Sequence, residues 1–106
     1  MEAEPLNLRA LEIMKKVLGP EHPDTATSLN NLALLYYAQK RYTEAKPLFN
    51  QSLEILQNRL GAKHPTTIKV VQNYAGLLRD MNRNPEADEL LSRFALPPDS
   101  GEPAKP

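Results

Sequence analysis

The sequence repeats itself at an offset of forty-two residues. From residue 2 to residue 43, 16 of the 42 residues are identical to the residue forty-two positions later. A third copy begins at Glu86 and breaks off near Phe94. A period of this length is typical of stacked arrays of supersecondary units, in which each unit packs on its neighbours. The identities keep the residues that break helices in one register, with Gly19, His22 and Pro23 returning as Gly61, His64 and Pro65.

Each repeat is predicted to contain two helices. In the first helix, apolar residues recur three and four positions apart, as they do on the buried face of a helix. Asp24 is placed to cap this helix, Thr43 to cap the second, and Asn84 to cap the last. Gly61 suits the left-handed turn at which the second helix stops. The pattern predicts an all-α chain of five helices, at residues 2–18, 24–39, 43–60, 66–81 and 85–95.

The chain has 106 residues, which allows one small domain and leaves no room for two. Residues 1–95 are predicted to form the helical repeat domain. Residues 96–106 hold four of the ten prolines and few apolar residues. We expect them to be a disordered or extended tail.

The composition argues against several classes of partner. Thirteen Lys and Arg balance thirteen Asp and Glu, so the chain lacks the excess charge that nucleic-acid binding needs. Cysteine is absent, which excludes disulfides, thiol catalysis and cysteine-ligated zinc. No run of eighteen apolar residues is long enough to span a membrane, and the first residues do not resemble a secretion signal. We expect a cytoplasmic protein with no nucleic-acid or membrane partner.

Catalysis and metal binding also lack candidate groups. The only two histidines, His22 and His64, occupy the same loop position one repeat apart. That separation is too large for both to bind one metal at bonds of about 2 Å. We expect each to be a loop histidine that bonds the start of the following helix. The four glycines are scattered, so no phosphate-binding loop is formed. We therefore expect no enzyme activity, no cofactor and no metal site.

The repeat resembles the tetratricopeptide repeat, in the longer forty-two-residue form found in kinesin light chains. The resemblance covers residues 2 to about 94 and implies a right-handed α-solenoid of antiparallel helix pairs, about two and a half units long. It also implies a concave groove, lined by the first helix of each unit, that binds a peptide segment of another protein. The residues that carry the pattern are Leu29, Leu32, Ala33, Tyr36, Ala45, Phe49 and Ser52, then Val71, Tyr74, Ala75, Leu78, Ala87, Leu91 and Phe94.

Eight residues are the candidates for this groove. The amide of Asn30 can both donate and accept, which suits the backbone of an extended peptide, and the resemblance implies that role. Lys69 and Arg79 would favour an acidic residue or a carboxyl terminus, while Gly76 would leave a dent for a partner side chain. The positions three, seven and ten residues after the first one on each helix give Thr27, Asn30, Leu34 and Tyr37, then Lys69, Gln72, Gly76 and Arg79.

The alternative is an assembly role. The array opens with a second helix that lacks its own first helix, and about three repeats are usually needed for stability. The chain is therefore expected to be a fragment of a longer array, to form a homo-oligomer end to end, or to be marginally stable. The candidates for end-to-end self-association are the apolar residues of the opening helix, Leu6, Leu8, Leu11 and Ile13.

Overall fold

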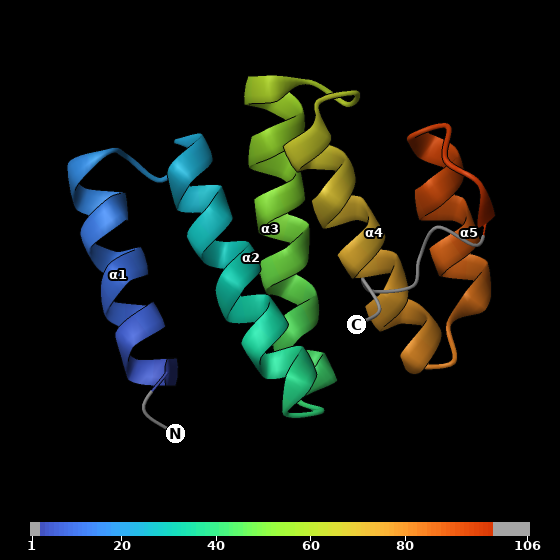
Figure 1. The fold of residues 1–106 in the computed structure, drawn as a ribbon, viewed down its shortest axis with the longest axis horizontal. Coiled ribbons are helices and arrows are strands. Elements are labelled where there is room, and N and C mark those ends of the chain that lie inside the picture. The colour runs from blue at the N-terminus through green and yellow to red at the C-terminus, as the bar shows by residue number, and fades with distance from the viewer. Residues whose placement is uncertain (1–2, 99–106) are drawn as a thin grey trace.

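A computed structural model describes residues 3–98, and it contains five α-helices and no strand within them. In Figure 1 the helices follow one another across the molecule in chain order, each antiparallel to the next. Each helix packs on its successor, and α2 also contacts α4. The prediction of an all-α solenoid of five helices is confirmed. The elements are α1 (Ala3–Val17), α2 (Pro23–Ala38), α3 (Tyr42–Leu60), α4 (Pro65–Asp80) and α5 (Asn84–Arg93).

The two histidines cap the first helix of each unit. The Nδ1 atom of His22 accepts a hydrogen bond from the backbone N–H of Asp24, at 3.0 Å. The same atom of His64 accepts from the N–H of Thr66, at 3.1 Å. The expectation that these histidines bond the start of the following helix is confirmed. The prediction that Asp24 is the cap was wrong, because Pro23 already occupies the first helical position.

The turn between the helices of a unit takes the same form twice. Lys40 and Asn82, forty-two residues apart, both adopt left-handed backbone angles, with φ of 61° and 62°. The second helix then begins earlier than predicted, at Tyr42 in one unit and at Asn84 in the next. Thr43 and Asn84 are therefore helical residues and not the caps that the sequence suggested.

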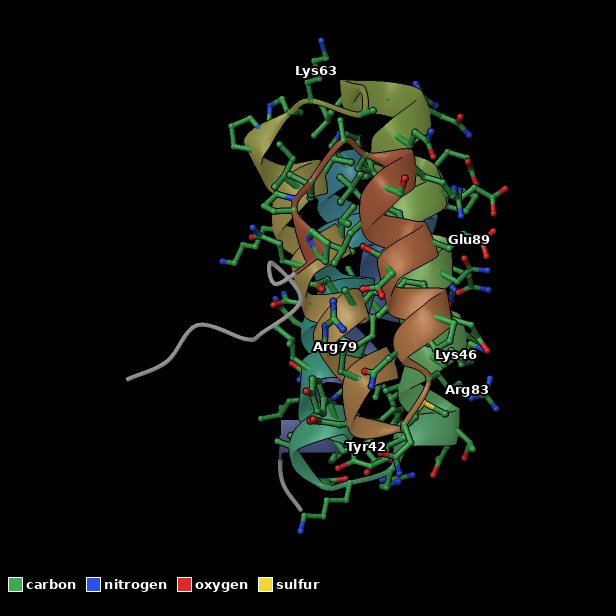
Figure 2. The ribbon with its side chains drawn as sticks, turned by 90° about the vertical axis from the view of Figure 1, so that its right-hand side faces the viewer. Tyr42, Lys46, Lys63, Arg79, Arg83 and Glu89 are labelled. Atoms are coloured by element: carbon green, nitrogen blue, oxygen red, sulfur yellow. The ribbon has the colours of Figure 1, made fainter. Side chains whose placement is uncertain are left out.

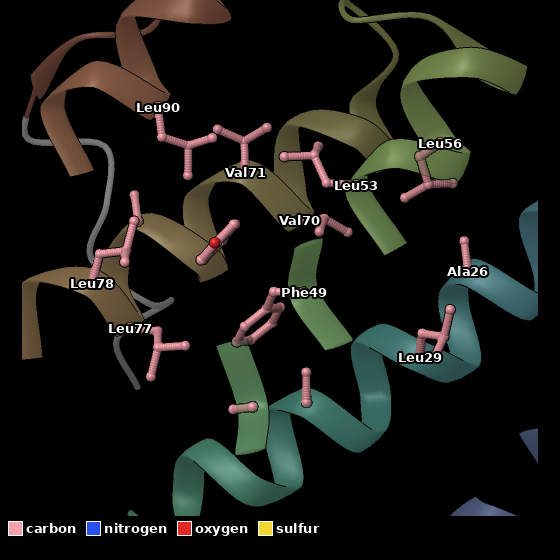
Figure 3. Close-up of a cluster of buried hydrophobic side chains, with 14 of the residues drawn as sticks. Ala26, Leu29, Phe49, Leu53, Leu56, Val70, Val71, Leu77, Leu78 and Leu90 are labelled. Atoms are coloured by element: carbon pink, nitrogen blue, oxygen red, sulfur yellow. The ribbon is translucent and has the colours of Figure 1, made fainter. Parts of the chain in front are cut away.

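The core runs through the middle of the array and is centred on Phe49. Figure 3 shows this ring among leucine and valine side chains from α2, α3 and α4. Phe49 is fully buried, stacks on Tyr74 with ring centroids 5.9 Å apart, and meets Tyr37 edge to face at 6.5 Å. The alanines at the helix crossings, Ala33 and Ala45, are also fully buried. Short side chains there let the helix backbones approach closely.

Arg41 ties α1 to the turn between α2 and α3. Its Nη1 atom donates to Glu4 at 2.7 Å, and its Nε atom donates to Glu44 at 2.8 Å. The guanidinium carbon lies 4.2 Å from the centre of the Tyr36 ring. The hydrogen bonds from Arg41 lower the pKa of the Glu44 carboxyl. One side chain thus holds three consecutive helices in register.

The last helix ends two residues earlier than predicted, at Arg93. Ala95 takes a left-handed conformation, and the N–H of Leu96 donates to the carbonyl of Leu91 at 2.9 Å. Leu96 is half-buried and packs against the core. Residues 96–98, which the sequence assigned to the tail, therefore adjoin the repeat domain. The rest of the predicted tail, 99–106, lies outside the described residues.

Candidate binding groove

The first helices of the two units, α2 and α4, lie side by side with a recess between them at their C-terminal ends. The recess has a volume of about 440 Å³. Its walls are mainly carbon atoms of Leu34, Tyr37 and Tyr42, and the two tyrosine rings meet edge to face at 5.8 Å. A recess of this kind suits one apolar side chain. The residues that line it are Leu34, Tyr37, Ala38, Lys40, Tyr42 and Asp80.

A hydrogen bond crosses the recess from α2 to α4. The hydroxyl of Tyr37 donates to the Oδ2 atom of Asp80 at 2.5 Å. Burial of the phenol, reinforced by this hydrogen bond, raises the pKa of Tyr37 well above its usual value. Tyr37 therefore stays a neutral donor at physiological pH, and the aspartate keeps its ring over the recess.

The four candidates on α2 lie in different environments. Leu34 and Tyr37 line the recess, as a groove residue should. Thr27 is exposed, and its hydroxyl donates to the carbonyl of Pro23 within its own helix. Asn30 is only 6% exposed, so it does not stand open on the surface as we expected. Its Oδ1 atom is buried and has no hydrogen-bond partner within the described chain.

Three candidates on α4 differ in how far they are exposed to solvent. Lys69 is exposed, Gln72 is half-buried and Gly76 is buried. The dent that we expected at Gly76 is therefore covered and is not open to a partner. Of these three candidates, Lys69, close to the start of α4, carries a charge, and its side chain is exposed.

Arg79 is directed towards α5 and not towards a guest. Its Nη2 atom lies 2.9 Å from Oδ1 of Asp88, and Nη1 lies 3.5 Å from Oδ1 of Asn84. It also donates to the carbonyl of Pro98. Figure 2 shows this side chain beside α5, at the C-terminal end of the array. The expectation that Arg79 attracts an acidic partner is corrected, because acids and carbonyls of this chain already surround it.

Sequence reasoning missed four residues of the recess, namely Ala38, Lys40, Tyr42 and Asp80. Tyr42 lies beyond the end of α2, so a helical spacing could not include it. Asp80 directly follows the candidate Arg79. The orientation of α4 against α2 brings the later of these two residues to Tyr37. The sequence offered one signal: Tyr37 near the end of α2 carries a hydroxyl, and Asp80 at the end of α4 carries a carboxylate that can accept a hydrogen bond from it.

The candidates for self-association divide into one core residue and three surface residues. Leu11 is only 6% exposed and belongs to the core, so its prediction as a surface residue is corrected. Leu6 and Ile13 are 66% and 53% exposed, and Leu8 is exposed as well. Within the described residues, α1 thus keeps apolar side chains on the surface.

The described residues also bear on other kinds of site. Between residues 3 and 98, no three His, Cys, Asp or Glu side chains come together to hold a metal ion. In the same range, no helix has the length and hydropathy that a membrane span requires.

The sequence profile of the tetratricopeptide repeat matches the chain twice, over residues 1–58 and 29–93. Two solved structures are similar, both of a kinesin light chain-like protein of Podosopora anserina with nearly identical repeats, one of them a variant. Each is 30% identical to this chain and covers 88% of it, with TM-scores of 0.78 and 0.77. The chain spans 44% of the length of those solved chains. No curated protein matches the sequence.

Proposed function

Because this chain belongs to the tetratricopeptide repeat family, whose members generally mediate protein–protein interactions, we propose that it binds an extended segment of a partner protein between α2 and α4, without catalysis. The recess of about 440 Å³ carries this proposal. It is an apolar hollow on the surface of the two first helices, where Leu34 and Tyr37 provide contact area. Buried apolar contacts of this kind supply most of the affinity of a peptide groove.

The buried amide of Asn30 supports the same groove. A buried polar atom without a hydrogen bond costs about 1–3 kcal/mol, so such atoms are rare. The Oδ1 atom of Asn30 is one of them, and it belongs to the same helix as Leu34 and Tyr37. To accept a hydrogen bond from the backbone of a guest, the Asn30 side chain would have to turn outwards when the guest binds, because its oxygen is buried in the free chain.

The charges on α4 suggest a direction for the guest. Lys69 and Asp80 lie eleven residues apart on the helix, which is about 16 Å at 1.5 Å per residue. An extended chain covers that distance with about five residues. We therefore expect an acidic group of the guest near Lys69 and an apolar side chain in the recess beside Asp80. The affinity should be modest, because one recess offers few contacts and ordering the guest costs entropy.

A peptide library with matched variants tests the proposal. Library peptides place an acidic residue about five positions from an apolar one, and binding is measured by fluorescence anisotropy. Leu34→Ala should weaken binding by about tenfold or more, because it removes one wall of the recess. Leu35→Ala is the control, since Leu35 is half-buried against the core but does not line the recess.

Circular dichroism checks that both leucine variants are folded. If the original chain, Leu34→Ala and Tyr37→Ala bind the peptide with equal affinity, the recess is not the binding site. A cytoplasmic location, expected from the sequence, remains part of this proposal.

An assembly role is the alternative, and the exposure of the opening helix favours it. Leu6, Leu8 and Ile13 leave an apolar surface in water on α1. Apolar surface of this kind marks interaction sites. The chain would then act by bringing copies or units together through its terminal helix.

A further inference from the structure

After its last helix the chain returns to α4. Leu96 packs against the core, and Arg79 of α4 donates a hydrogen bond to the carbonyl of Pro98. Asp80, the next residue of α4, lines the recess between α2 and α4. Pro98, the last residue that the structure describes, is therefore held beside the helix that forms one wall of the recess, at the end of that helix where the recess lies.

The segment that follows Pro98 is long enough to enter the recess. Arg79 and Asp80 are about 100° apart around α4, so a chain that passes from one to the other crosses part of a helix that is about 10–12 Å wide. An extended segment of the polyproline type advances about 3.1 Å per residue. Four residues beyond Pro98 therefore cover about 12 Å, which brings Glu102 and Pro103 within reach of the recess.

This segment also has a composition that an aromatic recess accepts. Residues 102–106 are Glu, Pro, Ala, Lys and Pro. Two prolines three residues apart favour the polyproline II helix, which docks in grooves lined by aromatic rings and loses little entropy when it binds. The recess offers two such rings, because Tyr37 and Tyr42 line it and meet edge to face at 5.8 Å.

The charges of the recess and of the segment are complementary. Beside its apolar walls, the recess is lined by one cation and one anion, Lys40 and Asp80. Within residues 3–98, neither of them forms an ion pair. The segment carries one charge of each sign around Pro103, namely Glu102 before it and Lys105 after it. Opposite charges in this arrangement favour one orientation of the segment over the other.

We propose that residues 102–106 occupy the recess of their own chain, with Pro103 against the tyrosine rings and Lys105 beside Asp80. The contact is small and would be weak between separate molecules. Because the segment is tethered at Pro98, its effective concentration at the recess is about millimolar, and a weak contact is then sufficient. This inference rests on the proposed function, since it uses the same recess, and it adds that a guest must displace this segment before it binds.

Disulfide trapping locates the segment in the full chain. The chain has no cysteine, so one is introduced at Ala104 and one at Ala38, an exposed residue that lines the recess. Docking brings the two Cα atoms close to the range of about 4.4–6.8 Å that a disulfide spans. Mild oxidation at low chain concentration should therefore join them within one molecule.

Thr27→Cys with Ala104→Cys is the matched control for this pair. Thr27 is exposed on the same helix, eleven residues from Ala38, which is about 16 Å. A segment that docks in the recess should react with Cys at position 27 about tenfold more slowly than at position 38, because its effective concentration there is lower. Circular dichroism checks that both double variants are folded.

Charge reversal tests the pairing of Lys105 with Asp80. Lys105→Glu should lower the ratio of the two trapping rates, position 38 over position 27, by about fivefold, since it places like charges together. The ratio removes any effect of the new charge on the neighbouring thiol, which is common to both rates. Lys63→Glu makes the same change in net charge at an exposed lysine before α4 and should leave the ratio unchanged.

Release of the segment should also strengthen the binding of guests. In the chain without cysteines, Lys105→Glu should bind the library peptides about two- to fivefold more tightly, because the apparent affinity falls with the fraction of recesses that are occupied. Lys63→Glu should bind them as the original chain does. Equal affinities of the original chain and Lys105→Glu would show that the segment does not compete with guests, which overturns the inference.

The trapping results separate this inference from the proposed function. Equal trapping at positions 38 and 27, or a ratio that Lys105→Glu leaves unchanged, overturns the docking of the segment. Guest binding that is weakened by Leu34→Ala would then still support the groove. Selective trapping at position 38, with no binding of any library peptide to Lys105→Glu, would support the docking and contradict the proposed function.

Discussion

Replacing Phe49 by alanine is expected to remove a large part of the stability of the array. The ring is fully buried between the two units, stacked on Tyr74 of α4 and in edge contact with Tyr37 of α2. Truncating a buried phenylalanine costs about 3–5 kcal/mol, and the aromatic pairs place this site in the upper half of that range. A domain of this size has a total stability of about 5–15 kcal/mol. Phe49→Ala should therefore lower the free energy of unfolding by about 4 kcal/mol.

The repeat itself supplies the control for this experiment. Leu91 occupies the equivalent position in the next unit and is fully buried there, so the repeat accepts leucine. Phe49→Leu keeps most of the volume and should cost less than about 1.5 kcal/mol. The chain lacks tryptophan, so urea titration is followed by far-UV circular dichroism. A cost below about 1.5 kcal/mol for Phe49→Ala, or equal costs for both variants, would show that this ring does not join the units.

Two further outcomes follow from the backbone and from the tyrosines. Gly61→Ala should lower the free energy of unfolding by about 1–3 kcal/mol in urea titration, because Gly61 has φ of 94° and ψ of 159°, which other residues strongly disfavour. An added Cβ would meet no atom within 4 Å, so an unchanged stability would refute the strain. Burial raises the pKa of Tyr37 and Tyr74 above their unfolded value of 10.0. The stability that this contributes is complete below about pH 10 and is lost as the pH rises further, so urea titrations at about pH 9 and pH 11 should differ, and less so in Tyr37→Phe.

The helices could be predicted because both copies of the repeat show the same helical spacing of apolar residues. The ends of the helices were harder, since they depend on backbone angles that the side chains only bias. His22 is an example: its bond to the start of the helix was expected, but the cap itself was assigned to Asp24, which is already inside the helix because Pro23 begins it. His64 caps α4 in the same way, so both copies of the repeat use the imidazole as the cap.

The groove could be predicted only in part, for a different reason. Helical spacing gives the side of a helix on which a residue lies, and it placed Leu34 and Tyr37 correctly in the recess. It does not give the depth to which the neighbouring helix covers that side. Asn30 and Gly76 were therefore expected on the surface and are buried. Arg79 pairs with Asp88 of the following helix, and such a contact between elements cannot be read from one helix.

The two junctions between units differ in the charges that meet there, although the repeat makes the units similar. At the first junction Arg41 joins two acids, Glu4 of α1 and Glu44 of α3, at 2.7 and 2.5 Å. At the second junction an acid is central instead, because Glu86 of α5 lies 3.6 Å from Lys46 of α3. Lys46 occupies the position equivalent to Glu4, so the sign of the charge is reversed at one position of the repeat. The change from Glu4 to Lys46 is matched by the ion-pair partner, which is Arg41 at the first junction and Glu86 at the second.

This matching makes the order of the units specific even though their backbones are alike. If Glu4 and Lys46 were exchanged, a lysine would lie beside Arg41 and a glutamate beside Glu86. Both contacts would then be repulsive, while the buried apolar residues would be unaffected. Partly exposed ion pairs contribute little to stability, but like charges in contact disfavour the wrong neighbour. Because the exchange leaves the buried residues unchanged, the charges at the turns, and not the core, distinguish the two arrangements.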